Sequence, residues 1–207
     1  MPRAPVDEIT LDRLKETMLY SEELGIQLNL KTDEEFFKWF LASVLFGARI
    51  SETIAKRTYR AFEKYGLLVP IKILNAGWDF LVNPVMREGG YVRYDEKTSR
   101  QVLNNCKVLL KEYEGSLTVL HEKAADGKDL EARLLAFYGI GPVTVNIFLR
   151  ELRPFWEKDT VEPLQKVREL ARRYAIGLRG LNPKTIEFVR IEAGLIRLRK
   201  NPTEPSP

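Results

Sequence analysis

The chain has one cysteine and one histidine among its 207 residues. The single cysteine, Cys106, excludes an internal disulfide framework, a zinc ribbon and any multi-cysteine iron–sulfur cluster. The single histidine, His121, argues against histidine-based catalysis and against a His-rich metal site. We therefore expect no cofactor and no metal. Without a partner motif, His121 is expected in a loop or on the surface, and Cys106 is expected in the core.

The sequence also has no run that approaches the roughly 20 consecutive apolar residues needed to cross a bilayer. Its first ten residues, MPRAPVDEIT, contain no apolar core of a signal peptide. These absences predict a soluble protein of the cytoplasm or nucleoid that has no membrane partner. We further expect a monomer.

What is present is the composition of a folded globular chain. Apolar residues make up 44% and charged residues 30%, which excludes a disordered or collagen-like polymer. The length predicts one domain, or two small ones that share a groove.

Positive charge is concentrated in the last third of the sequence. The net charge is +4, and residues 143–200 alone carry 13 basic and 7 acidic side chains, a local charge of +6. Such a segment favours binding to a polyanion. The alternative is a helix with a solvated basic face.

Helical signals recur along the chain, and no strand-like alternation persists. Thr32 and Ser51 are typical helix N-caps, and the segments that follow them end at Gly47 and Gly66. The first of these segments is apolar nearly all round, which predicts a central buried helix. Further helices are expected over residues 69–78, 95–115, 129–138, 142–152, 163–175 and 183–200. The predicted fold class is all-α.

A glycine-rich hairpin is the most informative segment. Residues 129–138 and 142–152 are two helical stretches joined by Gly139-Ile140-Gly141. Pro142 suits the first position of the second helix, and Ile140 is expected to pack inward. The N–H groups of Gly141, Val143 and Thr144 would face outward at a helix N-terminus, where an anion can bind. The alternative is an ordinary helical hairpin with a glycine stop.

Four segments in order resemble the helix-hairpin-helix DNA glycosylases of the endonuclease III superfamily. Residues 137–146, FYGIGPVTVN, resemble the family's L-P-G-V-G-x-K-T-A-N hairpin. Residues 91–110 resemble its G-L-Y-x-x-K-A-x-x-I helix, and residues 41–53 its L-L-S-A-Q-A-T-D segment. Asp159-Thr160, followed by a helix, resembles the V-D-T-H element. The matches cover roughly residues 33–175.

The resemblance implies roles for particular residues. Asp159 would stabilise positive charge on the sugar or orient the attacking water. Its alternative role is a helix cap, with Glu162 three residues on. Arg49 occupies the position at which a side chain of the family fills the gap that an extruded nucleotide leaves in the duplex. The alternative interpretation of Arg49 is a surface arginine. Gly139, Gly141, Val143 and Thr144 would hold a DNA phosphate.

The sequence also departs from the family's pattern. Bifunctional members use a hairpin lysine as a Schiff-base nucleophile, and this chain has Val143 at that position. Lys158 directly precedes Asp159 in the sequence, but no motif places its side chain in the same site. The family's four-cysteine cluster is absent, which leaves the damaged base undefined. Trp156 could stack on a flipped base, whereas the spacing of Phe36, Phe37 and Trp39 favours core packing.

These observations predict a two-lobed helix-hairpin-helix glycosylase fold with a central cleft. We expect an N-terminal helix in residues 1–32 that packs on the C-terminal lobe, and a central helical lobe over residues 33–135. The hairpin and basic lobe would occupy residues 136–200, before a disordered tail at 201–207.

The expected partner is double-stranded DNA with a damaged or mismatched base. The expected activity is monofunctional hydrolysis of the N-glycosidic bond. The alternatives are a non-catalytic DNA-structure binder on the same scaffold and a helical interaction protein with no nucleic-acid role.

Overall fold

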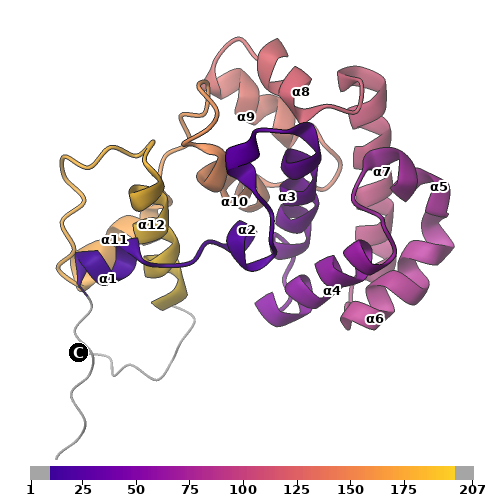
Figure 1. Cartoon of the computed structure of the whole chain (residues 1–207), viewed down its shortest axis with the longest axis horizontal. Helices are drawn as coiled ribbons and strands as arrows, with labels where there is room; N and C mark the ends of the chain where they lie inside the picture. The colour runs from indigo at the N-terminus through magenta and orange to yellow at the C-terminus, as the bar shows by residue number, and fades with distance from the viewer. Residues whose placement is uncertain (1–9, 199–207) are drawn as a thin grey trace, which may run out of the picture. The chain divides into compact units, whose positions relative to one another are not determined.

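A computed structural model describes residues 10–198 of the chain, and in this range the fold is all-α, with no strand. Figure 1 shows the helices in chain order. The predicted tail at 201–207 lies outside the described residues. Within them, no helix is long and apolar enough to cross a membrane.

The chain divides into two compact units. Among the described residues, one contains residues 10–19 and 162–198, and the other contains residues 20–161. These boundaries differ from the predicted ones at 32/33 and 135/136, because the hairpin belongs with the central helices. Its second helix, α10 (Pro142–Leu152), packs on α3 (Asp33–Phe46), where the indole nitrogen of Trp39 donates to the carbonyl oxygen of Phe148 at 3.0 Å.

The larger unit is built around α3, as its apolar sequence predicts. Thr32 caps the helix by accepting from the amide of Glu35, and ten of its fourteen residues are buried. The other helices of this unit are α2 (Tyr20–Glu23), η1 (Leu28–Leu30), α4 (Glu52–Lys64), α5 (Pro70–Phe80), η2 (Leu81–Met86), α6 (Arg87–Gly89), α7 (Asp95–Tyr113), α8 (Leu117–Lys123) and α9 (Gly127–Leu135). Phe36, Phe37 and Trp39 lie in the core, and so does Cys106. Burial raises the pKa of the Cys106 thiol to about 12, so this cysteine is unsuited to act as a nucleophile.

The smaller unit is formed by described segments that precede and follow the larger unit in the sequence. Helix α1 (Leu11–Lys15) packs on α12 (Ile186–Leu198), which also packs on α11 (Gln165–Arg173). The shared core includes Leu14, Val167, Ile191 and Leu195. Most of the basic segment predicted to bind a polyanion therefore lies in this unit, between residues 162 and 198.

Two local expectations are wrong. Helix α8 forms where a loop is expected, because Ser116 caps it and Leu117 and Leu120 are buried in the core. His121 therefore lies in a helix, where its ring packs against Trp156 in a tilted arrangement with ring centroids 4.7 Å apart. Helices α11 and α12 begin two and three residues after Pro163 and Pro183, close to their expected approximate starts.

Candidate functional site

The hairpin has a tight turn that only partly follows the sequence expectation. Gly139 adopts a left-handed conformation (φ 71°), whereas Gly141 is extended (φ −115°) and stands directly before Pro142, the first residue of α10. Ile140 packs into the core as expected, with its amide donating to the carbonyl oxygen of Phe137 at 3.1 Å. The first amides of α10 have no acceptor within their own helix, so the turn presents N–H donors to a ligand.

Beside this turn lies a hollow of about 370 Å³, called here the hairpin hollow. It is formed by three segments that are far apart in sequence: the end of α3, the start of α7 and the hairpin. Its lining residues are Val44, Gly47, Ala48, Arg49, Tyr94, Lys97, Thr98, Gln101, Gly139 and Thr144. Three residues predicted from the sequence, Arg49, Gly139 and Thr144, therefore meet in one cavity.

Glycine allows the three segments to approach closely. A Cβ on Gly139 would lie 2.9 Å from the Gln101 side chain. A Cβ on Gly47 would lie 2.0 Å from the hydroxyl oxygen of Thr144, which is itself buried. A side chain at Gly47 would push the hairpin away from α3, whereas one at Gly139 would displace the flexible carboxamide of Gln101.

Gly47→Ala is therefore expected to destabilise the protein by about 1–3 kcal/mol, as overpacking typically does. Urea unfolding would measure the change in the free energy of unfolding. Gly177→Ala is the matched control, because a Cβ there has nothing within 4 Å. Adding Thr144→Ala should restore part of the stability, since it removes the nearest atom. A Gly47→Ala protein as stable as the parent would contradict this packing.

Two further residues of the hairpin lie at the turn without lining the hollow. Gly141 is half-buried, and the side chain of Val143 is 57% exposed. Val143 carries no group able to attack a sugar carbon. The residues that sequence reasoning missed are Tyr94, Lys97, Thr98 and Gln101. Their spacing places them on one face of α7 and was the available signal.

Asp159 is fully buried and does not line the hairpin hollow. Its carboxylate accepts from the amide of Val161 at 3.0 Å, and its own amide donates to the carbonyl oxygen of Trp156. Trp156 in turn packs on Phe36 in the first turn of α3, with ring centroids 5.4 Å apart. The hairpin hollow lies near the other end of α3. Its lining residue Val44 follows Phe36 by eight residues, which is about 12 Å along the helix axis.

Two other residues considered from the sequence, Trp156 and Lys158, lie close to Asp159 in the chain and make contacts of their own. Trp156 is 3% exposed and packs between core aromatic rings, so it offers no open face to a base. The ammonium group of Lys158 donates to the carbonyl oxygens of His121, Glu122 and Ala124, at the end of α8. In this conformation Lys158 therefore stabilises a helix end.

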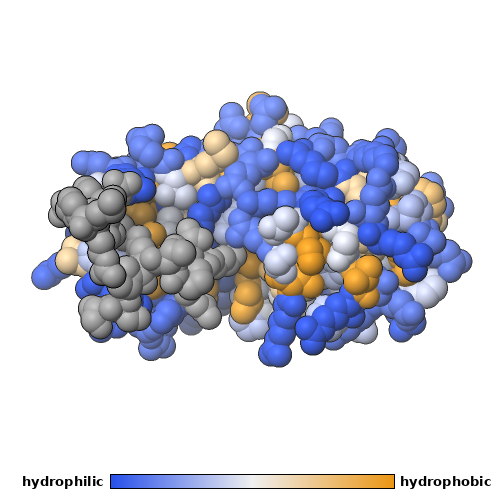
Figure 2. All heavy atoms as spheres, turned by 90° about the horizontal axis from the view of Figure 1, so that it is seen from below, coloured by the Kyte–Doolittle hydropathy of each residue, from blue (hydrophilic) through white to orange (hydrophobic). Residues whose placement is uncertain are grey.

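No group of three or more histidine, cysteine, aspartate or glutamate side chains within residues 10–198 could hold a metal ion. The face of the molecule in Figure 2 is mainly hydrophilic, with separate apolar patches. The chain matches no protein-family model, no curated protein and no solved structure.

Proposed function

We propose that this protein is a DNA glycosylase of the helix-hairpin-helix type, with two helical lobes around a central cleft. It would bind duplex DNA that contains a damaged or mismatched base and hydrolyse the N-glycosidic bond of that nucleotide. The observation that carries the proposal is the meeting of Arg49, Gly139 and Thr144, from separate segments, in the hairpin hollow.

The chemistry of the hairpin hollow suits a nucleic-acid backbone. The exposed side chains of Arg49 and Lys97 line it together with the Gln101 carboxamide, and the first amides of α10 lie at its edge. Arginine, lysine and helix N-termini are the usual donors to DNA phosphates. A volume of about 370 Å³ falls within the range of about 300–1,000 Å³ typical of small-ligand pockets.

The proposed hydrolysis uses Asp159. A carboxylate can stabilise an oxocarbenium-like sugar or orient the water that attacks C1′. Because Val143 stands at the hairpin position where bifunctional relatives have lysine, we propose a monofunctional reaction that leaves an abasic site. Since Asp159 is fully buried, the proposal requires DNA binding to uncover it.

A non-catalytic DNA-structure binder on the same scaffold is the second candidate. Two observations favour it: Val143 at the lysine position, and the burial of Asp159 at the far end of α3 from the hairpin hollow. In this case the hairpin hollow would bind the DNA backbone, and no N-glycosidic bond would be hydrolysed.

The first experiment uses labelled duplexes that each carry uracil, a G·T mismatch, 8-oxoguanine, hypoxanthine or 3-methyladenine. The products are run on denaturing gels with and without alkali. Strand breaks that need alkali would support the monofunctional glycosylase and identify its base. Breaks without alkali would contradict the role inferred from Val143, and no release from any lesion would favour the binder.

Replacing Lys97 with glutamine tests the hairpin hollow itself. Phosphate contacts make affinity fall steeply with salt, and losing one contact lowers the slope of log affinity against log salt by about 1. We expect this change in titrations of duplex DNA at several salt concentrations. Lys111→Gln is the matched control, because Lys111 is an exposed lysine at the other end of α7. Weak, salt-insensitive binding by the parent protein would rule out both DNA-binding functions and favour the helical interaction protein.

A further inference from the structure

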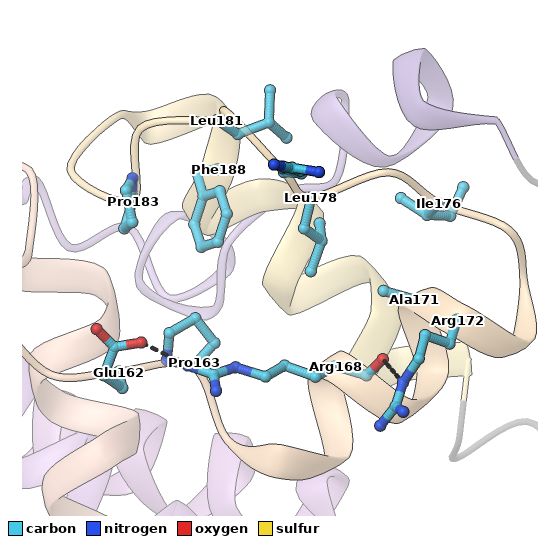
Figure 3. A pocket seen from close by; sticks show the side chains of 11 residues that line it. Glu162, Pro163, Arg168, Ala171, Arg172, Ile176, Leu178, Leu181, Pro183 and Phe188 are labelled. Carbon is cyan, nitrogen blue, oxygen red and sulfur yellow. Dashed lines mark hydrogen bonds and ion pairs between the residues drawn. The ribbon is translucent and has the colours of Figure 1, made fainter.

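The smaller unit contains a second cavity, of about 460 Å³ (Figure 3). Its polar groups are largely used within the protein. Arg168 pairs with Glu162 at 2.6 Å, and Arg172 donates from Nε to the carbonyl oxygen of Arg168 at 3.3 Å, as the dashed lines in Figure 3 show. The hairpin hollow differs from this cavity, because polar side chains in its lining have no hydrogen-bond partner among residues 10–198.

The carboxamide of Gln101 lies against the hairpin turn. A Cβ on Gly139 would lie 2.9 Å from the carbon of this carboxamide and 3.1 Å from both its nitrogen and its oxygen. Both residues line the hairpin hollow, and the Gln101 side chain makes no hydrogen bond with any other described residue. A carboxamide carries a donor nitrogen and an acceptor oxygen side by side. A ligand in the hollow therefore meets a donor and an acceptor that the described part of the chain does not use.

Thr144 provides a second unpaired group, from another segment of the chain. It is 6% exposed and lines the hairpin hollow, and its hydroxyl oxygen would lie 2.0 Å from a Cβ on Gly47. Within the described residues this hydroxyl makes no hydrogen bond. Because a buried hydroxyl without a partner is costly, Thr144 favours a ligand that supplies the missing hydrogen bond.

The two charged residues of the lining are its exposed members. Arg49 and Lys97 are exposed, whereas Val44 is buried and Ala48 and Tyr94 are half-buried. The interior therefore combines apolar surface with neutral hydrogen-bonding groups. A DNA phosphate is best matched by charged donors, so it suits the exposed arginine and lysine. A nucleobase has apolar faces and an edge that carries donors and acceptors, so it suits the interior.

We propose that the hairpin hollow holds an unpaired nucleobase of DNA, whose edge pairs with the Gln101 carboxamide and the Thr144 hydroxyl. The inference rests on the proposed function, because it requires DNA binding, and it adds a base contact to the backbone contacts. Asp159 is not part of the lining and lies toward the opposite end of α3. A base in the hollow is therefore recognised without being released.

Affinity titrations of the full chain with three duplexes of one sequence test the proposal. One duplex is fully paired, one carries a single extra adenine, and one carries an abasic residue in place of that adenine. We expect the adenine bulge to bind about 10-fold more tightly than the abasic bulge, because a bidentate contact to a base discriminates to about this extent. The two bulged duplexes have the same number of phosphates, so the ratio of their affinities measures the contribution of the base.

Two variants remove the proposed base contacts. Gln101→Leu replaces the carboxamide by an apolar group of similar size and should reduce this ratio to about twofold or less. Thr144→Val keeps the shape of the side chain without its hydroxyl and should reduce the ratio about threefold. Asn104→Leu is the matched control, because it changes an exposed carboxamide of α7 outside the lining. It should leave the ratio within about twofold of that of the parent.

Several outcomes would overturn the inference. They are equal affinities for the two bulges, an undiminished ratio in both Gln101→Leu and Thr144→Val, or equal losses in Asn104→Leu and Gln101→Leu. Release of the bulged adenine by the parent protein would also overturn it, since the hollow would then be catalytic. Equal binding of all three duplexes together with release of a damaged base would refute the inference and leave the proposed function standing. Failure to bind any of the three duplexes at low salt would refute both.

Discussion

Asp159→Asn is expected to lower the rate of base release on the order of 10³-fold, as loss of one essential electrostatic group does in other enzymes. The neutral amide cannot stabilise a positively charged sugar or activate a water. It keeps an oxygen that can accept from the Val161 amide, so the local turn should survive. The rate is measured under single-turnover conditions on whichever lesion duplex the parent protein cleaves.

The control for this experiment is Asp79→Asn, which removes an exposed carboxylate from α5. DNA affinity and thermal midpoint should be unchanged in the control and close to the parent in Asp159→Asn. Undiminished excision by Asp159→Asn would refute the mechanism. A large fall in thermal midpoint together with lost DNA binding would show that the role of Asp159 is structural. That role would not be the helix cap considered from the sequence, because Leu164 is the N-cap of α11 and the Asp159 carboxylate accepts from the Val161 amide instead.

Glu151→Ala is expected to destabilise the protein by about 3–5 kcal/mol, the usual cost of breaking a buried ion pair by removing one partner. Glu151 is fully buried and lies 3.7 Å from the guanidinium of Arg150, which is 2% exposed. Its carboxylate also accepts from the amides of Tyr20 and Ser21, at 3.3 and 3.1 Å. Burial raises the pKa of Glu151, because the charged form loses hydration.

Urea unfolding of three variants separates the contributions. Glu151→Gln keeps the volume but points an amide donor where two backbone donors converge, so it should fall between the parent and alanine. Glu112→Ala removes an exposed carboxylate from α7, with an expected cost below about 1 kcal/mol. A Glu151→Ala protein within about 1 kcal/mol of the parent would contradict the cost expected for leaving the Arg150 charge buried without its partner.

The helices were largely predictable because their signals are local. Thr32 and Ser51 each cap the helix that follows them, and α10 begins at Pro142 as expected. The apolar residues on nearly all sides of α3 correctly predicted that it is the central buried helix. Helix α8 was not predicted, because seven residues are too few to show a clear helical period of apolar residues. A helix this short is stabilised mainly by packing into the core.

The candidate site was predictable only in part. The hairpin glycines and Arg49 were found from motifs, each within a few residues of sequence. Lys97 and Gln101 were not singled out, because their spacing puts them on one face of α7 but does not show that this face meets a loop some 40 residues later.

The sequence by itself determined the all-α class, the hairpin with its glycine turn, and the burial of Cys106, because capping, periodicity and hydrophobicity act over one or two turns of chain. The tertiary structure alone decided that Arg49, Lys97 and Gly139 line one hollow, and that Asp159 lies buried toward the opposite end of α3. It also decided that Lys158 is used to hold the end of α8. These arrangements depend on which helix faces meet, and that is fixed by the joint packing of side chains from segments far apart in sequence.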